Sequence, residues 1–432
     1  MLIADLYKLY LQFPSVQTDT RKVEKDDLFF ALKGPSFNGN NFAEDALSKG
    51  AAYVVVDELP ENIDRRIINV TDVLKALQDL ALHHRSQFMF SISGKQIPFI
   101  AVTGSNGKTT SKELIHAVLS SSFKTYTTEG NLNNHIGIPL TILKVKEDAE
   151  IAIIEMGANH QKEIEAYCAY TIPTHGVITN CGKAHLEGFG GEEGVRKGKG
   201  ELYDYLRLHS GTAFVMWDYD YLQEMSKGIP TMITYGTHNA EVTGIVKSSS
   251  GLLEVLITAG ADISSVKTNL VGEYNLPNIL LAVAIGKYFK VPDEKIKWAL
   301  ENYIPSNSRS QLIEKDGNKI ILDSYNANPT SMKAAIENFA KMEGVDKVLM
   351  LGGMMELGPE SLHEHQDLIT LINKYKWQAV VLVGGDFNKV NHSFSFFESS
   401  LQAKEWYKNQ NFSHSNILIK GSRSTAMEKV LE

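Results

Sequence analysis

Segment 103–110 of the chain reads TGSNGKTT and directly follows an apolar run at 97–102. A glycine-rich turn between a buried strand and a helix presents backbone N–H groups at the helix N-terminus, and such groups bind phosphate. The segment departs from the general phosphate-loop consensus, because Val102 stands at the position of the first glycine. The feature predicts an α/β domain whose sheet ends at a nucleotide site.

The positions of this loop have distinct expected roles. Lys108 would reach the β- and γ-phosphates, and Thr109 would offer its hydroxyl to Mg²⁺. The residues expected to contact the nucleotide here are Gly104, Ser105, Asn106, Gly107, Lys108, Thr109 and Thr110. The loop by itself indicates only a nucleotide phosphate, and it fits a motor ATPase or a kinase equally well.

The rest of the chain forms three blocks in which apolar runs alternate with helical stretches. Its 432 residues suffice for about two to four domains. We predict an α/β fold with a small N-terminal domain at 1–93, a central P-loop-type domain with a parallel sheet at 94–304, and a third α/β domain at 305–432. Residues 91–95 have the composition of a linker. Strands are predicted at 28–32, 52–56, 97–102, 151–155, 176–180, 319–323, 347–351 and 379–383, and helices at 41–49, 73–88, 192–206 and from Thr109 onward.

Composition excludes several classes of protein. The formal charge of −8 argues against broad nucleic-acid binding, which needs a basic face. Two cysteines are too few for a disulfide framework. Asp5 and Lys8 interrupt the first apolar stretch, so it is a poor signal peptide. We find no run of about 18 apolar residues, and therefore expect no membrane span and a cytoplasmic location.

Two polar residues follow predicted strands of the central block. Glu155 ends the apolar run 151–154, where a carboxylate can order Mg²⁺ beside phosphates, although an exposed strand-end acid is the alternative. His185 lies in the loop after the strand at 176–180. A lone loop histidine is more often structural or solvated, so its role depends on its neighbours.

Lys199 occupies an unusual position for a lysine. In the predicted helix 192–206 it shares the apolar stripe with Val195, Leu202, Tyr203 and Leu206. Burial lowers the pKa of a lysine, and a neutral amine can add CO₂ to form a carbamate, an anionic metal ligand. The alternative is a lysine whose ammonium reaches solvent from the edge of the stripe.

Taken together, these segments resemble the Mur ligases of peptidoglycan synthesis, and two of them resemble the MurF branch in particular. Those two are DSYNANP at 323–329 and GNLNNHIGIP at 130–139. The other matching segments are TDTR at 18–21, the phosphate loop, EMGAN at 155–159, residues 180–187, GKGE at 198–201, GEYNLPN at 272–278 and GSRS at 421–424. The resemblance therefore spans nearly the whole chain.

The resemblance implies a monomeric ligase with a UDP-binding N-terminal domain, an ATPase domain and a Rossmann-like third domain. The implied substrates are ATP, UDP-N-acetylmuramoyl-tripeptide and D-alanyl-D-alanine, joined through an acyl phosphate. Lys108, His185 and Lys199 would be catalytic, and two Mg²⁺ ions would be held by Thr109, Glu155, His185 and a carbamylated Lys199. Thr20, Arg21, Asn131, Asn133, Asn134, Asn326 and Asn328 would contact substrates, and Asn275, Arg309 and Asp323 would contact the nucleotide.

One departure and three alternatives accompany this interpretation. Segment 37–41 has asparagines where the family often shows Asp-Gly-His, which weakens any role for an imidazole there. Another Mur ligase or a folylpolyglutamate synthase is the nearest alternative. A P-loop motor or transport ATPase would not explain Lys199, and a non-catalytic nucleotide-binding protein predicts the loss of metal ligands that are all present.

Overall fold

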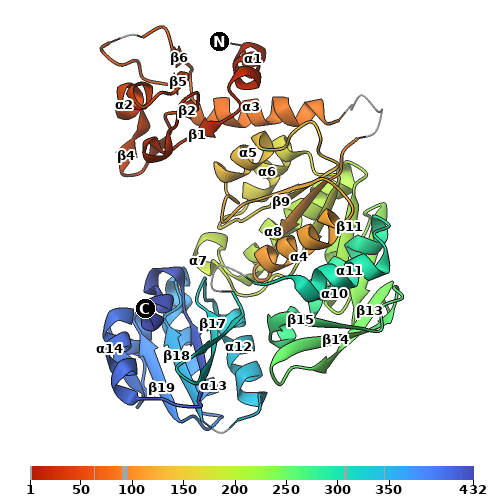
Figure 1. Ribbon diagram of the computed structural model, residues 1–432, viewed down its shortest axis with the longest axis vertical. Coiled ribbons are helices and arrows are strands. Elements are labelled where there is room, and N and C mark those ends of the chain that lie inside the picture. The colour runs from red at the N-terminus through yellow and green to blue at the C-terminus, as the bar shows by residue number, and fades with distance from the viewer. Residues whose placement is uncertain (1, 63, 90–95, 306–308, 345) are drawn as a thin grey trace. The chain divides into compact units, whose positions relative to one another are not determined.

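The computed structural model of the chain describes residues 2–62, 64–89, 96–305, 309–344 and 346–432 (Figure 1). The predicted linker at 91–95 lies outside these residues. The described chain divides into two compact units. Unit 1 comprises Met1–Ala101, Lys124–Gly157 and Glu163–His175, and unit 2 comprises Val102–Phe123, Ala158–Lys162 and Gly176–Glu432.

The N-terminal part of unit 1 is a small parallel sheet with the strand order β1-β2-β5-β6. Its core packs apolar side chains of β2 and β5 against helix α2. These elements are β1 (Val16–Gln17), β2 (Leu28–Phe30), β5 (Tyr53–Val56), β6 (Ile67–Asn69) and α2 (Ala43–Ser48), with a hairpin of β3 (Lys33–Gly34) and β4 (Phe37–Asn38). The apolar runs predicted at 28–32 and 52–56 are therefore strands, and the predicted helix at 41–49 begins with a 3₁₀ turn at Gly39–Phe42.

Helix α3 (Val73–Gln87) packs along its length against α1 (Ile3–Gln12), α5 (Gly137–Leu143) and α6 (Glu163–Thr171). Asp72 begins α3 by accepting a hydrogen bond from the backbone N–H of Lys75. Near its end Arg85 is fully buried and donates to the carbonyl oxygens of Thr171 and Ile172, both at 2.9 Å. Its guanidinium carbon also lies 3.8 Å from the centroid of the Phe99 ring. Arg85 therefore satisfies two carbonyl oxygens at the C-terminal end of α6.

The central sheet has the strand order β15-β14-β13-β12-β11-β10-β7-β9-β8. Parallel pairing joins β8 to β9 and β11 to β12, whereas β13, β14 and β15 pair antiparallel with one another. The strands are β7 (Phe99–Thr103), β8 (Thr125–Thr127), β9 (Ile151–Glu155), β10 (His175–Ile178), β11 (Thr212–Met216), β12 (Thr231–Gly236), β13 (Val242–Ser248), β14 (Leu252–Ala259) and β15 (Ser265–Val271). The antiparallel extension was not predicted, since we expected an all-parallel sheet here.

In unit 2, α10 (Leu276–Tyr288) packs against α4 (Lys108–Ser120), the helix that follows the phosphate loop. Helix α10 is apolar around most of its circumference, which suits a helix buried on several sides. Helix α8 (Glu192–Leu208) instead buries one stripe. The remaining helices of this region are α7 (Leu186–Phe189), α9 (Asp220–Ser226) and α11 (Asp293–Asn302).

The last part of unit 2 is a sheet with the order β16-β17-β21-β18-β19-β20, parallel except for β16. Figure 1 shows α14 on one face and α12 on the other. Alternate strand residues such as Ile320, Leu322 and Val348 form a core with Ala403 of α14. The elements are β16 (Gln311–Lys315), β17 (Asn318–Asp323), β18 (Lys347–Gly352), β19 (Ala379–Val383), β20 (Ser395–Phe397), β21 (Asn416–Lys420), α12 (Pro329–Lys341), α13 (Ser361–Ile372) and α14 (Ser400–Gln410).

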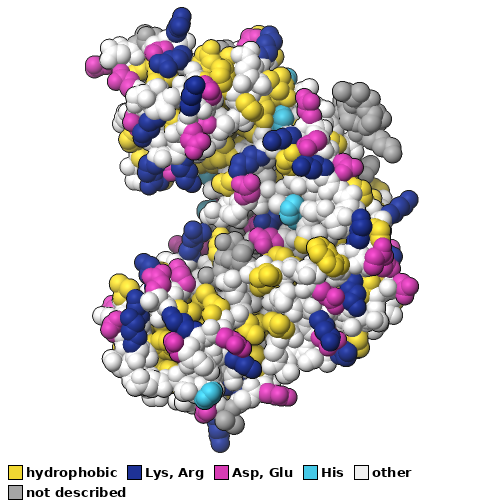
Figure 2. All heavy atoms as spheres, viewed as in Figure 1, with side chains coloured by type: hydrophobic (Ala, Val, Ile, Leu, Met, Phe, Trp, Pro, Cys, Tyr) yellow, Lys and Arg dark blue, Asp and Glu magenta, His cyan; other side chains and the backbone are white. Residues whose placement is uncertain are grey.

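Two expectations from composition concern the surface charge and the absence of a membrane-spanning helix. On the face drawn in Figure 2, Lys and Arg side chains are interspersed with Asp and Glu rather than gathered in a field of one sign. Across the described residues no helix combines the length and apolarity needed to cross a membrane.

The buried guanidinium of Arg85 gives a testable prediction about unit 1. Arg85→Met removes a donor from two buried carbonyl oxygens, at a cost of about 1–3 kcal/mol for each acceptor left unsatisfied. We expect faster amide hydrogen exchange at 163–172, measured by mass spectrometry. Lys75→Met is the matched control, because Lys75 lies on the same helix and is exposed. Unchanged protection of 163–172 in Arg85→Met would contradict this account.

Candidate active site

The phosphate loop joins β7 to α4, and two of its glycines have positive φ, 140° at Gly104 and 80° at Gly107. A Cβ on Gly104 would lie 2.0 Å from Oγ1 of Thr179, and one on Gly107 would lie 2.7 Å from Oδ1 of Asn278. Both positions therefore require glycine for backbone conformation and for space.

The segment after β10 holds this loop in shape. The Asn180 side chain accepts from the backbone N–H of Asn106 at 3.1 Å and donates to its carbonyl oxygen at 3.0 Å. The Thr179 hydroxyl donates to the same oxygen at 2.6 Å, and the N–H of Ser105 donates to the Asn180 carbonyl. The predicted strand at 176–180 ends at Ile178, because its last two residues bond the phosphate loop instead.

Lys108 and Thr109 occupy the first turn of α4. The Lys108 ammonium donates to the carbonyl oxygens of Gly104 and Ser105, at 2.7 and 3.2 Å, so it lies over the loop where phosphates would bind. Thr109 is buried. The expected contacts of Lys108 with phosphates and of Thr109 with Mg²⁺ stay predictions.

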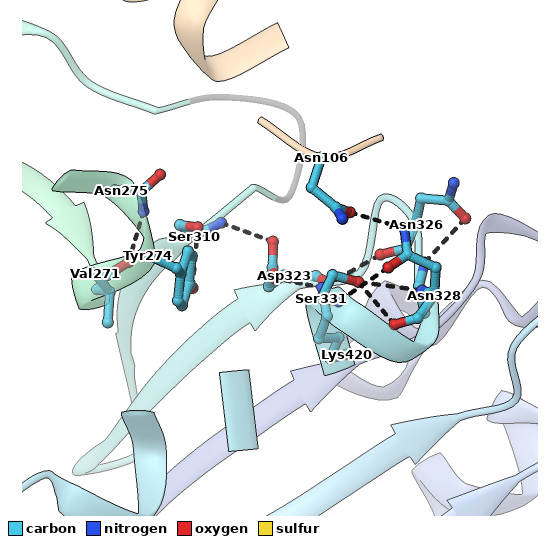
Figure 3. Close-up of polar contacts among 11 residues, drawn as sticks. Asn106, Val271, Tyr274, Asn275, Ser310, Asp323, Asn326, Asn328, Ser331 and Lys420 are labelled. Carbon is cyan, nitrogen blue, oxygen red and sulfur yellow. Dashed lines mark hydrogen bonds and ion pairs between the residues drawn. The ribbon is translucent and has the colours of Figure 1, made fainter. Parts of the chain in front are cut away.

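A chain of amides connects the loop region to α10. Ser111 on α4 donates to Oδ1 of Asn278, which donates from Nδ2 to Oδ1 of Asn275, and Asn275 donates to the carbonyl oxygen of Val271. Asn275 is therefore buried in a network that fixes the start of α10, and Figure 3 shows its hydrogen bond to Val271. Its predicted contact with the nucleotide stays a prediction.

In unit 1, Glu155 ends β9 and is 1% exposed. Its backbone N–H donates to the hydroxyl of Thr128, and its Oε1 accepts from Nδ2 of Asn133 at 2.8 Å. Asn133 and Glu155, predicted separately as a substrate contact and a metal ligand, are thus direct partners. Asn134 accepts from the N–H groups of Ile136 and Gly137, and Asn131 is exposed.

Lys199 lies in the apolar stripe of α8, as the spacing predicted, and it is 1% exposed, which the spacing left open. Its Nζ donates to the carbonyl oxygen of Ala158 at 2.9 Å and lies 4.9 Å from the centroid of the Phe189 ring. The alternative of an ammonium that reaches solvent is therefore wrong. An ammonium held by a carbonyl and an aromatic ring is costly to desolvate, which favours chemistry that changes its charge.

His185 adopts a left-handed backbone conformation, with φ of 52°, and its ring is mostly buried. Its Nδ1 lies in close contact with Oε2 of Glu356 from the loop after β18, although the two atoms are not aligned as a hydrogen bond requires. Contact with His185 lowers the pKa of Glu356, and His160 acts in the same direction.

The loop between β10 and α8 is further held by the region after residue 329. The Lys183 ammonium lies 2.6 Å from Oε1 of Glu364 on α13, and its backbone N–H donates to the hydroxyl of Thr330. The hydrogen bond from Lys183 to this buried carboxylate raises the pKa of Lys183.

Asn328 begins α12 in a capping box with Ser331, and its Nδ2 donates to Oδ1 of Asn106 at 2.7 Å (Figure 3). The sheet of β16 to β21 with its helices, called here the third sheet region, therefore touches the phosphate loop directly. Close by, Asp323 accepts from Lys420 at 2.6 Å and from the N–H of Ser310 at 3.2 Å. Lys420 also donates to the carbonyl oxygen of Asn326, so Asp323 and Asn326 share one cation.

Arg309 and Arg423 both lie near the ring of Tyr325. The guanidinium carbons are 3.5 and 5.4 Å from its centroid, and Arg423 also donates to the hydroxyl at 3.4 Å. In the N-terminal domain, Arg21 is exposed and pairs with Asp19, which lowers the pKa of that carboxyl to about 2, while the Thr20 carbonyl accepts from Lys49. The expected substrate or nucleotide contacts of Thr20, Arg21 and Arg309 stay predictions.

The side chains of this site suit magnesium only if oxygens of a bound nucleotide complete its coordination. Among the residues that the structure describes, no three His, Cys, Asp or Glu side chains form a metal cage. Mg²⁺ is commonly bound through one or two protein oxygens together with substrate phosphates. The buried Glu155 and the buried Thr109 each offer an oxygen of that kind.

Several residues of this site were not predicted as functional. They are Asn278, Glu356, Lys420 and Tyr325. A charge at the end of the apolar strand 416–420 was a readable signal for Lys420. The others had no local signal, because their importance comes from partners far away in the sequence.

Comparison with known proteins identifies what this fold and site define. Three family models match the chain: the Mur ligase family, catalytic domain, at 12–85; the Mur ligase middle domain at 102–286; and the Mur ligase, glutamate ligase domain, at 308–428. Together with the phosphate loop they define an ATP-dependent, ADP-forming ligase.

Individual relatives agree with this assignment over nearly the full chain. The UDP-N-acetylmuramoyl-tripeptide–D-alanyl-D-alanine ligase of Bacillus subtilis is 35% identical, over 96% of this chain and 92% of its own. The structure is similar to MurF from Acinetobacter baumannii, with a TM-score of 0.86 at 31% identity over 96% of this chain and 92% of that chain. It is equally similar to Thermotoga maritima MurF ligase in complex with ADP, with a TM-score of 0.86 at 25% identity over 98% and 97%. The chain belongs to the Mur ligase family, and its three-domain α/β architecture is confirmed.

The glycine requirement of the loop is directly testable. Gly104→Ala places a methyl group against Thr179 and should displace the loop, weakening ADP binding about 100-fold or more by calorimetry. Gly251→Ala is the control, since a Cβ there meets nothing within 4 Å. Wild-type affinity in Gly104→Ala would show that the loop tolerates the displacement.

Proposed function

We propose that the chain joins D-alanyl-D-alanine to UDP-N-acetylmuramoyl-tripeptide in an ATP-dependent reaction that forms ADP and phosphate. The observation that carries this proposal is the full-length similarity to enzymes of that name, together with the contact between Asn328 and Asn106. That contact brings the third sheet region to the phosphate loop. A ligase requires this, because both of its substrates must reach the same ATP.

The reaction proceeds in two steps. An oxygen of the tripeptide carboxylate attacks the γ-phosphorus of ATP, forming an acyl phosphate as the bond to ADP breaks. The dipeptide amine then attacks the acyl carbon, phosphate leaves with the C–O bond electrons, and the amine nitrogen gives up a proton. The first step brings two anions together, so positioned positive charge contributes a large part of the catalysis.

Residues of the loop provide part of that charge. Lys108, already held over Gly104 and Ser105, would neutralise the β- and γ-phosphates, and the N–H groups of the loop would bind their oxygens. Asn275, Arg309 and Asp323 would bind the nucleoside side. Thr20 and Arg21 would bind the UDP moiety, while Asn131, Asn133, Asn134, Asn326 and Asn328 would line the paths of the two substrates.

Two Mg²⁺ ions fit this chemistry, because they would screen the approaching anions and orient them. Thr109 and Glu155 would hold one ion, and His185 with a carbamate on Lys199 would hold the other. The burial of Lys199 supports the carbamate, since adding CO₂ to its neutral amine replaces a buried cation by an anion that a metal can balance.

Two further proposals concern the cellular location and the oligomeric state of the enzyme. UDP-linked intermediates and ATP are cytoplasmic metabolites, so we propose that the enzyme acts in the cytoplasm. We further propose that it acts as a monomer, as the resemblance to the Mur ligases implies. A sedimentation coefficient independent of protein concentration would agree with that.

The reaction itself is tested by omission. ADP formation should require both UDP-N-acetylmuramoyl-tripeptide and D-alanyl-D-alanine, with the ligated pentapeptide product detected by mass spectrometry. Leaving out either substrate is the control. Hydrolysis of ATP that continues without them would instead favour a motor or transport ATPase.

The carbamate has its own test. Lys199→Ala should lower kcat by about 1000-fold, and a small carboxylate such as formate should restore part of the activity. Lys197→Ala on the same helix is the control, because Lys197 is exposed and pairs only with Glu193 among the ion pairs described. Full activity of Lys199→Ala would rule out the carbamate.

A further inference from the structure

The loop after β18 lies against the segment that contains His185. Oε2 of Glu356 lies in close contact with Nδ1 of His185, and the carbonyl oxygen of Glu356 accepts from the N–H of Glu187 at 3.4 Å. A Cβ built on Gly358 would lie 3.1 Å from Cβ of Glu187. The loop after β18 therefore contacts both His185 and Glu187, through its backbone and its side chains.

This contact is one of several that fasten the same segment. Lys183 is held two residues earlier by Glu364 and Thr330, which also come from the region after residue 329. The segment 183–187 is therefore supported from the third sheet region at several points. Glu356 is the member of this set that reaches an imidazole.

A histidine binds a metal through one ring nitrogen while the other nitrogen fixes the orientation of the ring. A carboxylate beside Nδ1 stabilises a proton there, which leaves the lone pair of Nε2 for the cation. Removal of such an outer carboxylate typically weakens metal binding about 10- to 100-fold. Glu356 stands at Nδ1 of His185, where a carboxylate of this kind belongs.

We propose that Glu356 is a positioning residue, which sets the tautomer and orientation of His185 so that Nε2 can bind the second Mg²⁺. The proposal rests on the proposed role of His185 as a metal ligand. It follows that this metal site is complete only while the loop after β18 is seated on segment 183–187. Seating of the third domain and loading of the second ion are then coupled, because each favours the same position of Glu356.

Binding of Mn²⁺, used in place of Mg²⁺, tests the proposal without turnover. We would titrate the full chain with Mn²⁺ by electron paramagnetic resonance, with a non-hydrolysable ATP analogue and bicarbonate present. Glu356→Ala should bind the weaker ion about 10- to 100-fold less tightly and the tighter ion unchanged. Glu356→Gln should fall between Glu356→Ala and wild type, because its amide oxygen can still lie beside Nδ1 but carries no negative charge.

The control is Glu360→Ala, which removes an exposed acid from the adjoining turn at Gly358–Glu360 and should bind both ions as wild type does. Thermal unfolding of each variant checks the fold, and Glu356 is half-exposed at 53%, so its loss should not unfold the chain. Equal affinity of Glu356→Ala and wild type for both ions would overturn the proposal.

His185→Ala separates this outcome from failure of the proposed function. If His185→Ala loses the weaker ion while Glu356→Ala keeps it, the positioning role is wrong and the metal role of His185 stands. If both variants keep it, the assignment of His185 as a ligand is wrong as well.

Discussion

The close approach of the phosphate loop to the end of β10 is the constraint on which the rest of the site depends. Gly104 leaves no room for a side chain beside Thr179, and Asn180 bonds both sides of the Asn106 backbone. The loop is therefore fixed before any ligand arrives, and its N–H groups need little reorganisation to bind phosphate. Lys108 is placed by the same geometry, since its acceptors are carbonyls of the loop.

From this fixed loop, connections extend to the other parts of unit 2. Ser111, Asn278 and Asn275 continue it into α10 through buried amides. Asn328 connects it to the start of α12. Because buried polar groups are costly when unpaired, each of these links favours one arrangement of the neighbouring elements. The residues proposed for the nucleotide and for the acceptor dipeptide are thus tied to the loop by hydrogen bonds.

Local patterns predicted much of this. Short continuous apolar runs predicted the strands β9 and β19 with their observed bounds, because strands buried on both faces show no polar alternation. Helical periodicity placed Lys199 in the apolar stripe of α8, although it left open whether the ammonium is buried. The helix α1 and the antiparallel strands β13 to β15 were missed. Short amphipathic segments of that kind depend on what they pack against, and their own sequence fits more than one structure.

The sequence by itself determined the α/β class, the phosphate loop and the place of Lys199 in an apolar stripe, because these follow from spacing within about twenty residues. Tertiary structure alone decided the partners. Asn328 and Asn106 are 222 positions apart, and Lys199 and Ala158 are 41 apart. His185 meets Glu356 only because the chain returns after β18 to the segment that follows β10. Such contacts depend on strand order and helix packing, which no local pattern encodes. They bring residues from distant parts of the chain to the phosphate loop, as a site that joins two substrates needs.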